Sequence, residues 1–270
     1  MTQIDDIGWI ARQGIGLVQN DGLRSALDAV YRSPLGIKVV DVAHHVFERL
    51  TAERLPAQKL CQFVSGWGST HGTALYVSGL VIRLQRAARE TGEASRTLLY
   101  RAATEIGEVI GEDTGVDDVP HRERFERFAN FVVGNDQWKL DRYDVPACVR
   151  FREYAKERRL GADLEDAILT TAASENWNTG EYTYFNSLVE RWAVDVLGYP
   201  LALREERFAY IAVHAGETEL GHFLHALKAW ELYCDAVGRP ADPRKAARCL
   251  ESYLRALTLA FKGLEQVLAE

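Results

Sequence analysis

Three histidines, with two glutamates among them, gather in one segment of this 270-residue chain. The segment spans residues 208–233, with the sequence FAYIAVHAGETELGHFLHALKAWELY, and we predict that it forms one long helix. Its candidate ligands are His214, Glu217, Glu219, His222 and His225. At about 100° of rotation per residue, all of these except Glu219 fall within one arc of roughly 140°.

Such an arc indicates metal binding if it faces the protein interior. Imidazoles and carboxylates are costly to bury unless something satisfies them. A transition metal would do so, because histidine nitrogen and carboxylate oxygen suit iron, manganese or zinc. The alternative is that these are ordinary surface or hydrogen-bonded histidines, which is the commoner case for two histidines three residues apart on a helix.

A second group of candidates lies in EIGEVIGEDTGVDDVPHRERFERF, residues 105–128. Three glutamates spaced three and four apart share one helix face there: Glu105, Glu108 and Glu112. After the turn GVDDVP, His121 begins the next helix, so that a carboxylate at one helix end and this imidazole can converge across a short loop. The alternative is a solvated acidic face, which is what such spacing usually means.

A third candidate is a glutamate in LTTAASENWNTGEYTYF, residues 169–185. Glu175 follows a run of small residues, which suits a carboxylate that faces inward where two helices approach closely. Glu181 is the alternative ligand. Either glutamate could instead cap a turn, because we expect the intervening NTG to break the helix.

Three further histidines lie earlier in the chain: His44 and His45 in VVDVAHHVFERL, and His71 in GWGSTHG. Adjacent residues on a helix point about 100° apart, so at most one of His44 and His45 can face a given site. We interpret both as structural.

The elements that position these residues are predicted to be helices almost throughout. Apolar residues recur at three- and four-residue spacing along most of the chain, and no alternating run predicts a strand. Ser95, Asp163 and Asp242 are placed to cap helices, and Pro243 would occupy a first helical turn. Short links and the lack of a Pro/Gly/Ser-rich linker favour one all-α domain, residues 1–270, of eight to ten helices.

Composition limits the class of partner. The net charge of −7 argues against nucleic acid or an anionic membrane as the main partner. The four cysteines are far apart, which predicts reduced thiols in a cytoplasmic protein and neither a disulfide framework nor a thiolate zinc site. No apolar run is long enough to cross a membrane. Exposed apolar helix faces are compatible with a homodimer.

The order of the segments resembles the haem-oxygenase-like helical fold, most of all its branch of diiron oxidases. HHVFERL, a long two-part helical stretch, GEDTG before PHRERFERF, AASE, and FAYIAVHAGETELGH carry the resemblance, over about residues 40–235. In that family three carboxylates and three histidines hold two irons. The late helix of the family carries the pattern H-x3-D-x2-H.

Carried onto this chain, the resemblance implies that the catalytic metal ligands are Glu112, His121, Glu175, His214 and His222, with Glu217 or Glu219 as the acidic ligand of the late helix. Two features depart from the family. His214 and His222 are eight residues apart where the family has seven, and Thr218 stands where the family has aspartate. A π-bulge could absorb the extra residue; without one, Glu217 would point nearer His214. Asp113 could replace Glu112.

The resemblance implies a non-haem iron oxidase or oxygenase that uses O₂ and two Fe(II) ions per chain. Manganese tolerates the same ligands, so the metal stays open. The implied substrate is a small amino acid, amine or fatty acid, often in specialised biosynthesis. One alternative is a metal-free enzyme of the thiaminase-like or pyrroloquinoline-quinone-synthase-like branches, in which Cys234 and Cys148 would matter more than His222. Another is a non-catalytic all-α binding protein.

Overall fold

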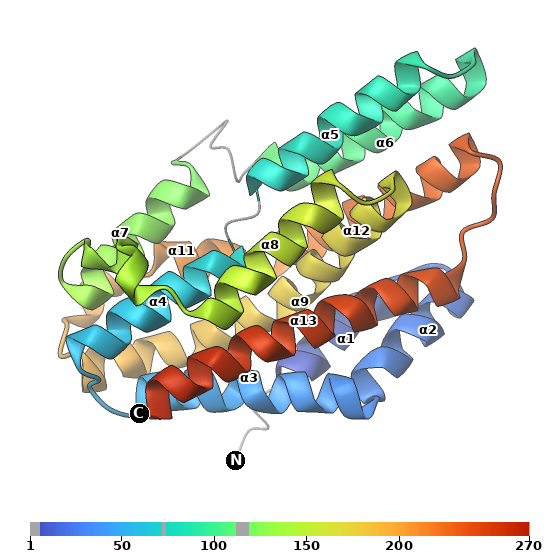
Figure 1. The fold of residues 1–270 in the computed structure, drawn as a ribbon. Helices are drawn as coiled ribbons and strands as arrows, with labels where there is room; N and C mark the ends of the chain where they lie inside the picture. Colours follow the sequence, from blue (N-terminus) through green and yellow to red (C-terminus); the bar gives the residue numbers. More distant parts are fainter. Residues whose placement is uncertain (1–5, 72–73, 112–118, 270) are drawn as a thin grey trace.

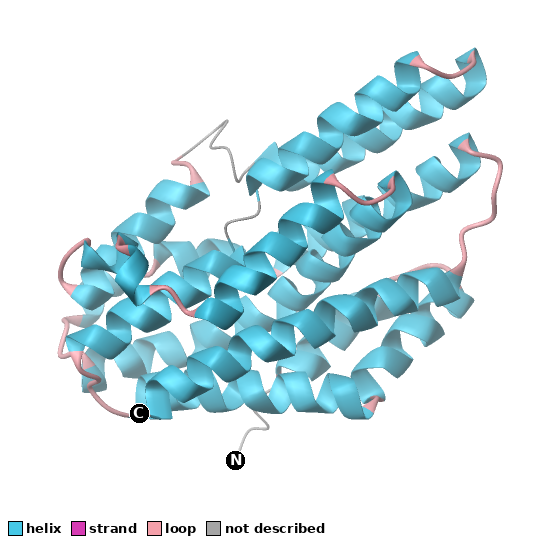
Figure 2. Ribbon diagram, in the orientation of Figure 1, coloured by secondary structure: helices cyan, strands magenta, loops and turns pink. Residues whose placement is uncertain are grey.

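The computed structural model describes residues 6–71, 74–111 and 119–269, all of which lie in helices or in the links between them (Figure 2). The larger helices are α1 (Ile7–Gly16), α2 (Asp21–Arg32), α3 (Pro34–Ala52), α4 (Ala57–His71), α5 (Ala74–Arg89), α6 (Glu93–Gly111), α7 (His121–Val133), α8 (Pro146–Leu160), α9 (Leu164–Arg191), α11 (Ala209–His214), α12 (Glu217–Ala236) and α13 (Pro243–Ala269). Short turns are η1 (Gln137–Lys139), η2 (Asp141–Tyr143), the π-helical turn η3 (Trp192–Val196), η4 (Leu201–Leu203) and α10 (Arg204–Arg207). The predicted all-α class is confirmed, with no strand among the described residues.

Helix α9 is the centre of the bundle, and it packs against α12, α1, α13, α8 and α11 (Figure 1). Elements from both ends of the chain share this core, because α13 runs beside α2 and α3. Helices α5 and α6 form a hairpin that packs on α12 through α6. Within the described residues, no helix has the length and apolar character needed to cross a membrane.

The prediction that NTG breaks the helix after Glu175 is wrong. Helix α9 continues through Asn178, Thr179 and Gly180. The glycine is present for a packing reason, since a Cβ at Gly180 would lie 2.3 Å from the carbonyl oxygen of Ile7. Its lack of a side chain lets the start of α1 lie directly on α9, and the helix keeps both Glu175 and Glu181 in the core.

The single helix predicted over residues 208–233 is also wrong. The segment forms two helices, α11 and α12, separated by Ala215 and Gly216. Gly216 has a φ of 89°, a left-handed backbone conformation that glycine adopts readily and that interrupts the helix. This interruption, and not a π-bulge, absorbs the extra residue between His214 and His222.

The helix caps are partly as predicted. Asp163 accepts a hydrogen bond from the Asp166 amide at the start of α9, and Asp242 accepts one from the Arg244 amide beside Pro243 at the start of α13. Ser95 does not cap a helix, because α6 begins at Glu93 and the Ser95 hydroxyl donates to the carbonyl of Ala236 at 2.7 Å. That bond joins α6 to the end of α12.

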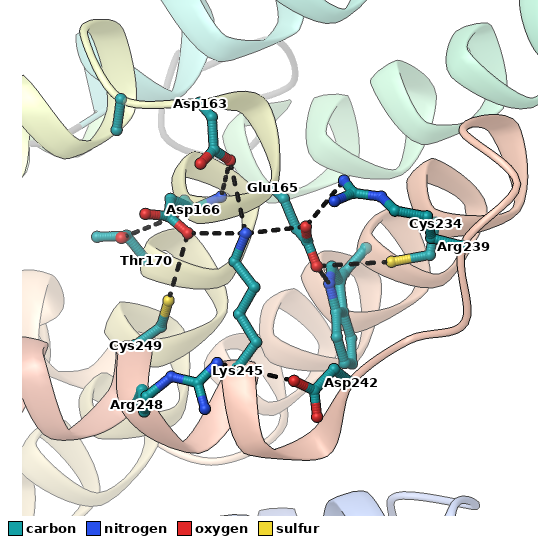
Figure 3. Close-up of polar contacts among 12 residues, drawn as sticks. Asp163, Glu165, Asp166, Thr170, Cys234, Arg239, Asp242, Lys245, Arg248 and Cys249 are labelled. Carbon is teal, nitrogen blue, oxygen red and sulfur yellow. Dashed lines mark hydrogen bonds and ion pairs between the residues drawn. The ribbon is translucent and has the colours of Figure 1, made fainter.

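A buried carboxylate network fixes the first turn of α9 (Figure 3). Glu165 is 4% exposed and accepts hydrogen bonds from the Lys245 ammonium at 2.9 Å, the Trp230 indole at 3.1 Å and the Arg239 guanidinium at 3.2 Å. Lys245 also lies 3.1 Å from Asp166. These contacts join α9 to the C-terminal half of α12, to the link after it and to the first turns of α13.

The charges in this network oppose the cost of burial. Burial raises the pKa of Glu165, but hydrogen bonds from Lys245 and Trp230, together with the charges of Lys245 and Arg239, hold it below its usual value. A carboxylate whose folded-state pKa is depressed stabilises the protein above its unfolded-state pKa, and that contribution is lost as the pH falls through the folded-state value.

We predict that Lys245→Met lowers the free energy of unfolding at pH 7 by roughly 2 kcal/mol, because Glu165 stays buried with fewer charged partners. The loss should shrink in acid, as the pH falls through the lowered pKa of Glu165. Urea unfolding at pH 7 and at successively more acidic pH measures it. Lys228→Met is the matched control, since Lys228 is about half exposed and pairs only with Glu231 on the surface. An equal effect of the two substitutions would contradict this account.

Candidate metal and substrate site

A cavity of about 240 Å³ lies where α4, α7, α9, α11 and α12 meet. Its wall contains most of the predicted ligands, and aromatic rings occupy much of the remainder. The lining residues are Gly68, His71, Leu75, His121, Arg122, Phe125, Glu175, Asn178, Tyr182, Tyr210, His214, Glu219 and His222.

Two histidines face each other on one side of this cavity. His121 is the first residue of α7 and His214 the last of α11, and their ring centres lie 4.3 Å apart. Both are buried. Tyr182 of α9 stacks on His214, with ring centres 4.4 Å apart and an angle of 18° between the planes. The stacking holds the His214 imidazole against the wall of the cavity.

Glu219 lies between His214 and a second group of ligands. Its Oε1 pairs with Nδ1 of His214 in a short contact. Its Oε2 lies 3.9 Å from Nδ1 of His222. Nδ1 of His222 is in turn 3.8 Å from Oε2 of Glu175 on α9. Each end of the Glu219 carboxylate therefore faces a different imidazole.

The second group is compact enough to hold one ion. Glu175, Glu219 and His222 each offer a ligand atom, and these atoms lie within 4.8 Å of one another. All three residues are buried. Glu219 Oε2 accepts no hydrogen bond from the described part of the chain, although it is shielded from solvent. A buried carboxylate oxygen without a donor is costly, and a cation would remove that cost.

The electrostatics are those of a carboxylate-rich buried site. Burial raises the pKa of Glu175, and the nearby charge of Glu219 adds to the rise, although His222 opposes it. Burial alone would lower the pKa of His222, but the two facing carboxylates outweigh it and raise the pKa to about 11. The imidazolium of His222 therefore balances negative charge that a metal ion could balance in its place.

The donor set fits a hard or borderline transition metal. Histidine nitrogens and carboxylate oxygens are the ligands that suit iron and manganese, whereas thiolates favour softer metals. None of the four cysteines, all of which are buried and free, lines the cavity. The prediction of free, buried thiols without a disulfide is confirmed.

The structure brings together five predicted site residues: His121, Glu175, His214, Glu219 and His222. Glu112 and its alternative Asp113 lie outside the described residues. The late helix carries Glu219 at the cavity, whereas Glu217 is exposed at the first position of α12. Of the two alternatives for the acidic ligand of the late helix, Glu217 does not fit, because the break at Gly216 leaves its side chain exposed to solvent.

The remaining histidine and glutamate candidates lie outside the cavity. His225 pairs with Glu105 at 2.7 Å outside the cavity, and Glu108 is exposed. His44 accepts a hydrogen bond from the Ile7 amide at 3.2 Å and stacks on Tyr184, which fits its interpretation as structural. His45 is exposed near Glu265.

The sequence indicated His71 as a histidine but gave it no role in the site. His71, at the end of α4, lies in the wall with its Nε2 3.3 Å from Glu181. Glu181 is fully buried and accepts hydrogen bonds from the indoles of Trp67, at 2.6 Å, and Trp177. Glu181 is thus engaged away from Glu175. No local pattern joins His71 to Glu181, because they are 110 residues apart.

A solved structure with a similar fold is known. The chain aligns with a TenA homolog from Pseudomonas syringae pv. tomato str. DC3000 with a TM-score of 0.64, over 90% of this chain and 93% of that one, at 16% identity. The chain has a TenA-like fold. This confirms the haem-oxygenase-like helical bundle predicted from sequence. No family model and no curated protein matches the chain, so its membership of the diiron oxidase branch stays a prediction.

We predict that the metal-free protein loses stability as the pH rises from about 6.5 toward 11. The folded-state pKa of His222 is raised to about 11, above the unfolded-state value of 6.5. The contribution of the His222 charge to the free energy of unfolding is therefore complete below pH 6.5 and is lost as the pH rises from 6.5 to about 11. Urea unfolding at pH 6 and pH 9 measures the loss, and His222→Gln should show a smaller one. Equal losses in both proteins would contradict the ion pairing of His222.

Proposed function

We propose that this protein is a non-haem iron oxidase or oxygenase that activates O₂ to oxidise a small organic substrate. The observation that carries the proposal is the Glu219 carboxylate, with one oxygen at His214 and the other beside His222. His121 and His214 lie on one side of this carboxylate and Glu175 and His222 on the other, and such nitrogen and oxygen donors suit iron. The resemblance of the sequence to diiron oxidases independently implies two irons per chain.

The ligands divide between the two sides of Glu219. His121 and His214 would hold one ion, and Glu175 and His222 the other, with Glu219 shared; Glu112 completes the set that the resemblance implies. Iron bound there would supply the electrons that activate O₂, chemistry that belongs to the metal. Manganese suits the same ligands.

The chain itself contributes positioning and exclusion of water. The ligands are buried, and Phe125, Tyr182 and Tyr210 present aromatic walls to the cavity. The cavity volume of about 240 Å³ lies below the range of roughly 300–1,000 Å³ that is typical of ligand pockets. A small substrate is therefore expected, from the amino-acid, amine or fatty-acid classes.

The metal-free alternative would need a nucleophile in the cavity. Cys234 lies 3.8 Å from Glu165 in the network of Figure 3, and Cys148 lies 3.5 Å from the carbonyl of Ala260. Burial raises the pKa of each thiol to about 12, which opposes formation of the thiolate. These positions favour the metal-dependent function over cysteine chemistry.

We predict that Glu219→Gln weakens Fe(II) binding at least about a hundredfold, because it removes the charge shared between the two sides of the site. Anaerobic titration followed by metal analysis measures the binding. Glu217→Gln is the matched control: it makes the same chemical change two residues away, on an exposed side chain. The proposal fails if both variants bind iron like the unaltered protein, or if the unaltered protein binds none.

We also predict that Cys234→Ser leaves iron-dependent O₂ consumption within about twofold of the unaltered protein, since this thiol lies outside the cavity. An oxygen electrode with the iron-loaded protein measures it. Activity that persists without metal and disappears in this variant would favour the metal-free enzyme.

A further inference from the structure

His71 places a positive charge in the cavity wall that the proposed metal site does not use. Its Nδ1 lies 3.0 Å from the carbonyl oxygen of Trp67, which can only accept a hydrogen bond. It also lies 2.9 Å from the Thr70 hydroxyl, which donates its own hydrogen to that same carbonyl. Both partners of Nδ1 are acceptors, so Nδ1 carries a proton.

The second ring nitrogen faces a buried carboxylate. Nε2 of His71 is 3.3 Å from Oε1 of Glu181. Each Glu181 oxygen accepts a hydrogen bond from one indole N–H, that of Trp67 or Trp177. A carboxylate at this distance favours a proton on Nε2 as well as on Nδ1. The two contacts together favour the imidazolium form of His71.

The two members of the His71–Glu181 ion pair lie at different depths relative to the cavity. Glu181 is fully buried beneath the wall and is not part of the lining, whereas His71 lines the cavity. The positive end of the pair therefore faces the substrate space. Burial would lower the pKa of His71, but Glu181, the Trp67 carbonyl and, to a smaller degree, the charge of Glu219 outweigh this effect and raise it. Arg122 adds a second cation to the wall, although it is mostly exposed and pairs with Glu126.

We propose that His71 is a specificity-determining residue, which selects a small substrate with an anionic group, a carboxylate, over a neutral or cationic one. Among the three substrate classes left open, this favours acids over simple amines. The inference rests on the proposed function in one respect only: that this cavity is the substrate site. Glu175 and Glu219 face the same space, but His222 lies between them and balances part of their charge.

Benzoate binding to the metal-free protein tests the proposal, with benzamide as the neutral probe of the same shape. Omitting metal keeps the result independent of iron, because a bare metal ion would itself bind a carboxylate. We expect benzoate to bind more tightly than benzamide. His71→Gln should weaken benzoate binding about tenfold or more and leave benzamide binding nearly unchanged, because a unit charge a few ångströms away acts mainly on an ion.

His225→Gln is the matched control, since His225 pairs with Glu105 outside the cavity and should leave both affinities unchanged. Nitrogen-15 chemical shifts of His71 provide a second measurement that needs no substitution, and they should report both ring nitrogens protonated at pH 7. Equal affinity for the two probes, benzoate binding that survives His71→Gln, or a neutral His71 ring would each overturn the proposal. Failure of iron binding would refute the oxidase function and leave this test intact.

Discussion

The burial of three carboxylates on the central helix is the constraint on which the rest of the structure depends. Glu165, Glu175 and Glu181 all lie on α9 and are at most 6% exposed. A carboxylate in such an interior is stable only when other elements bring it donors or cations. Helix α4 supplies such a partner to Glu181, α13 to Glu165, and α12 to both Glu165 and Glu175.

The three carboxylates are satisfied in different ways, and the difference separates structure from function. Glu165 has a lysine, an arginine and an indole, which complete its environment. Glu181 has two indoles and the His71 imidazolium. Glu175 lies 3.8 Å from a histidine that it shares with Glu219, and Oε2 of Glu219 has no hydrogen-bond donor among the described residues. The least satisfied carboxylates are those at the cavity, where a metal ion would complete their environment.

Much of the fold could be predicted from sequence, because helical periodicity and the caps at Asp163 and Asp242 are local signals. The identity of the late acidic ligand could not. An uninterrupted helix would direct Glu217 toward His214, and only the left-handed backbone of Gly216 brings Glu219 there instead. Glycine in GETELG gives no local sign of whether it ends a helix or lies within one.

The same limit applies to the centre of the bundle. Gly180 looks like a helix breaker, but it marks the place where α1 touches α9. The pairing of His71 with Glu181 joins residues of two helices far apart in the chain, so no local spacing could reveal it. Most of the titratable residues at the cavity could be named from sequence, but which of them lie together depends on tertiary contacts.

The central claim is that Glu219 lies between two metal ions. Crystals grown anaerobically with Fe(II), and measured at the iron absorption edge, test it directly. The account predicts two anomalous peaks in the cavity, one on the His121 and His214 side of the Glu219 carboxylate and one on the Glu175 and His222 side. Iron-free density in this cavity after saturating Fe(II), or iron bound only elsewhere on the protein, would contradict it.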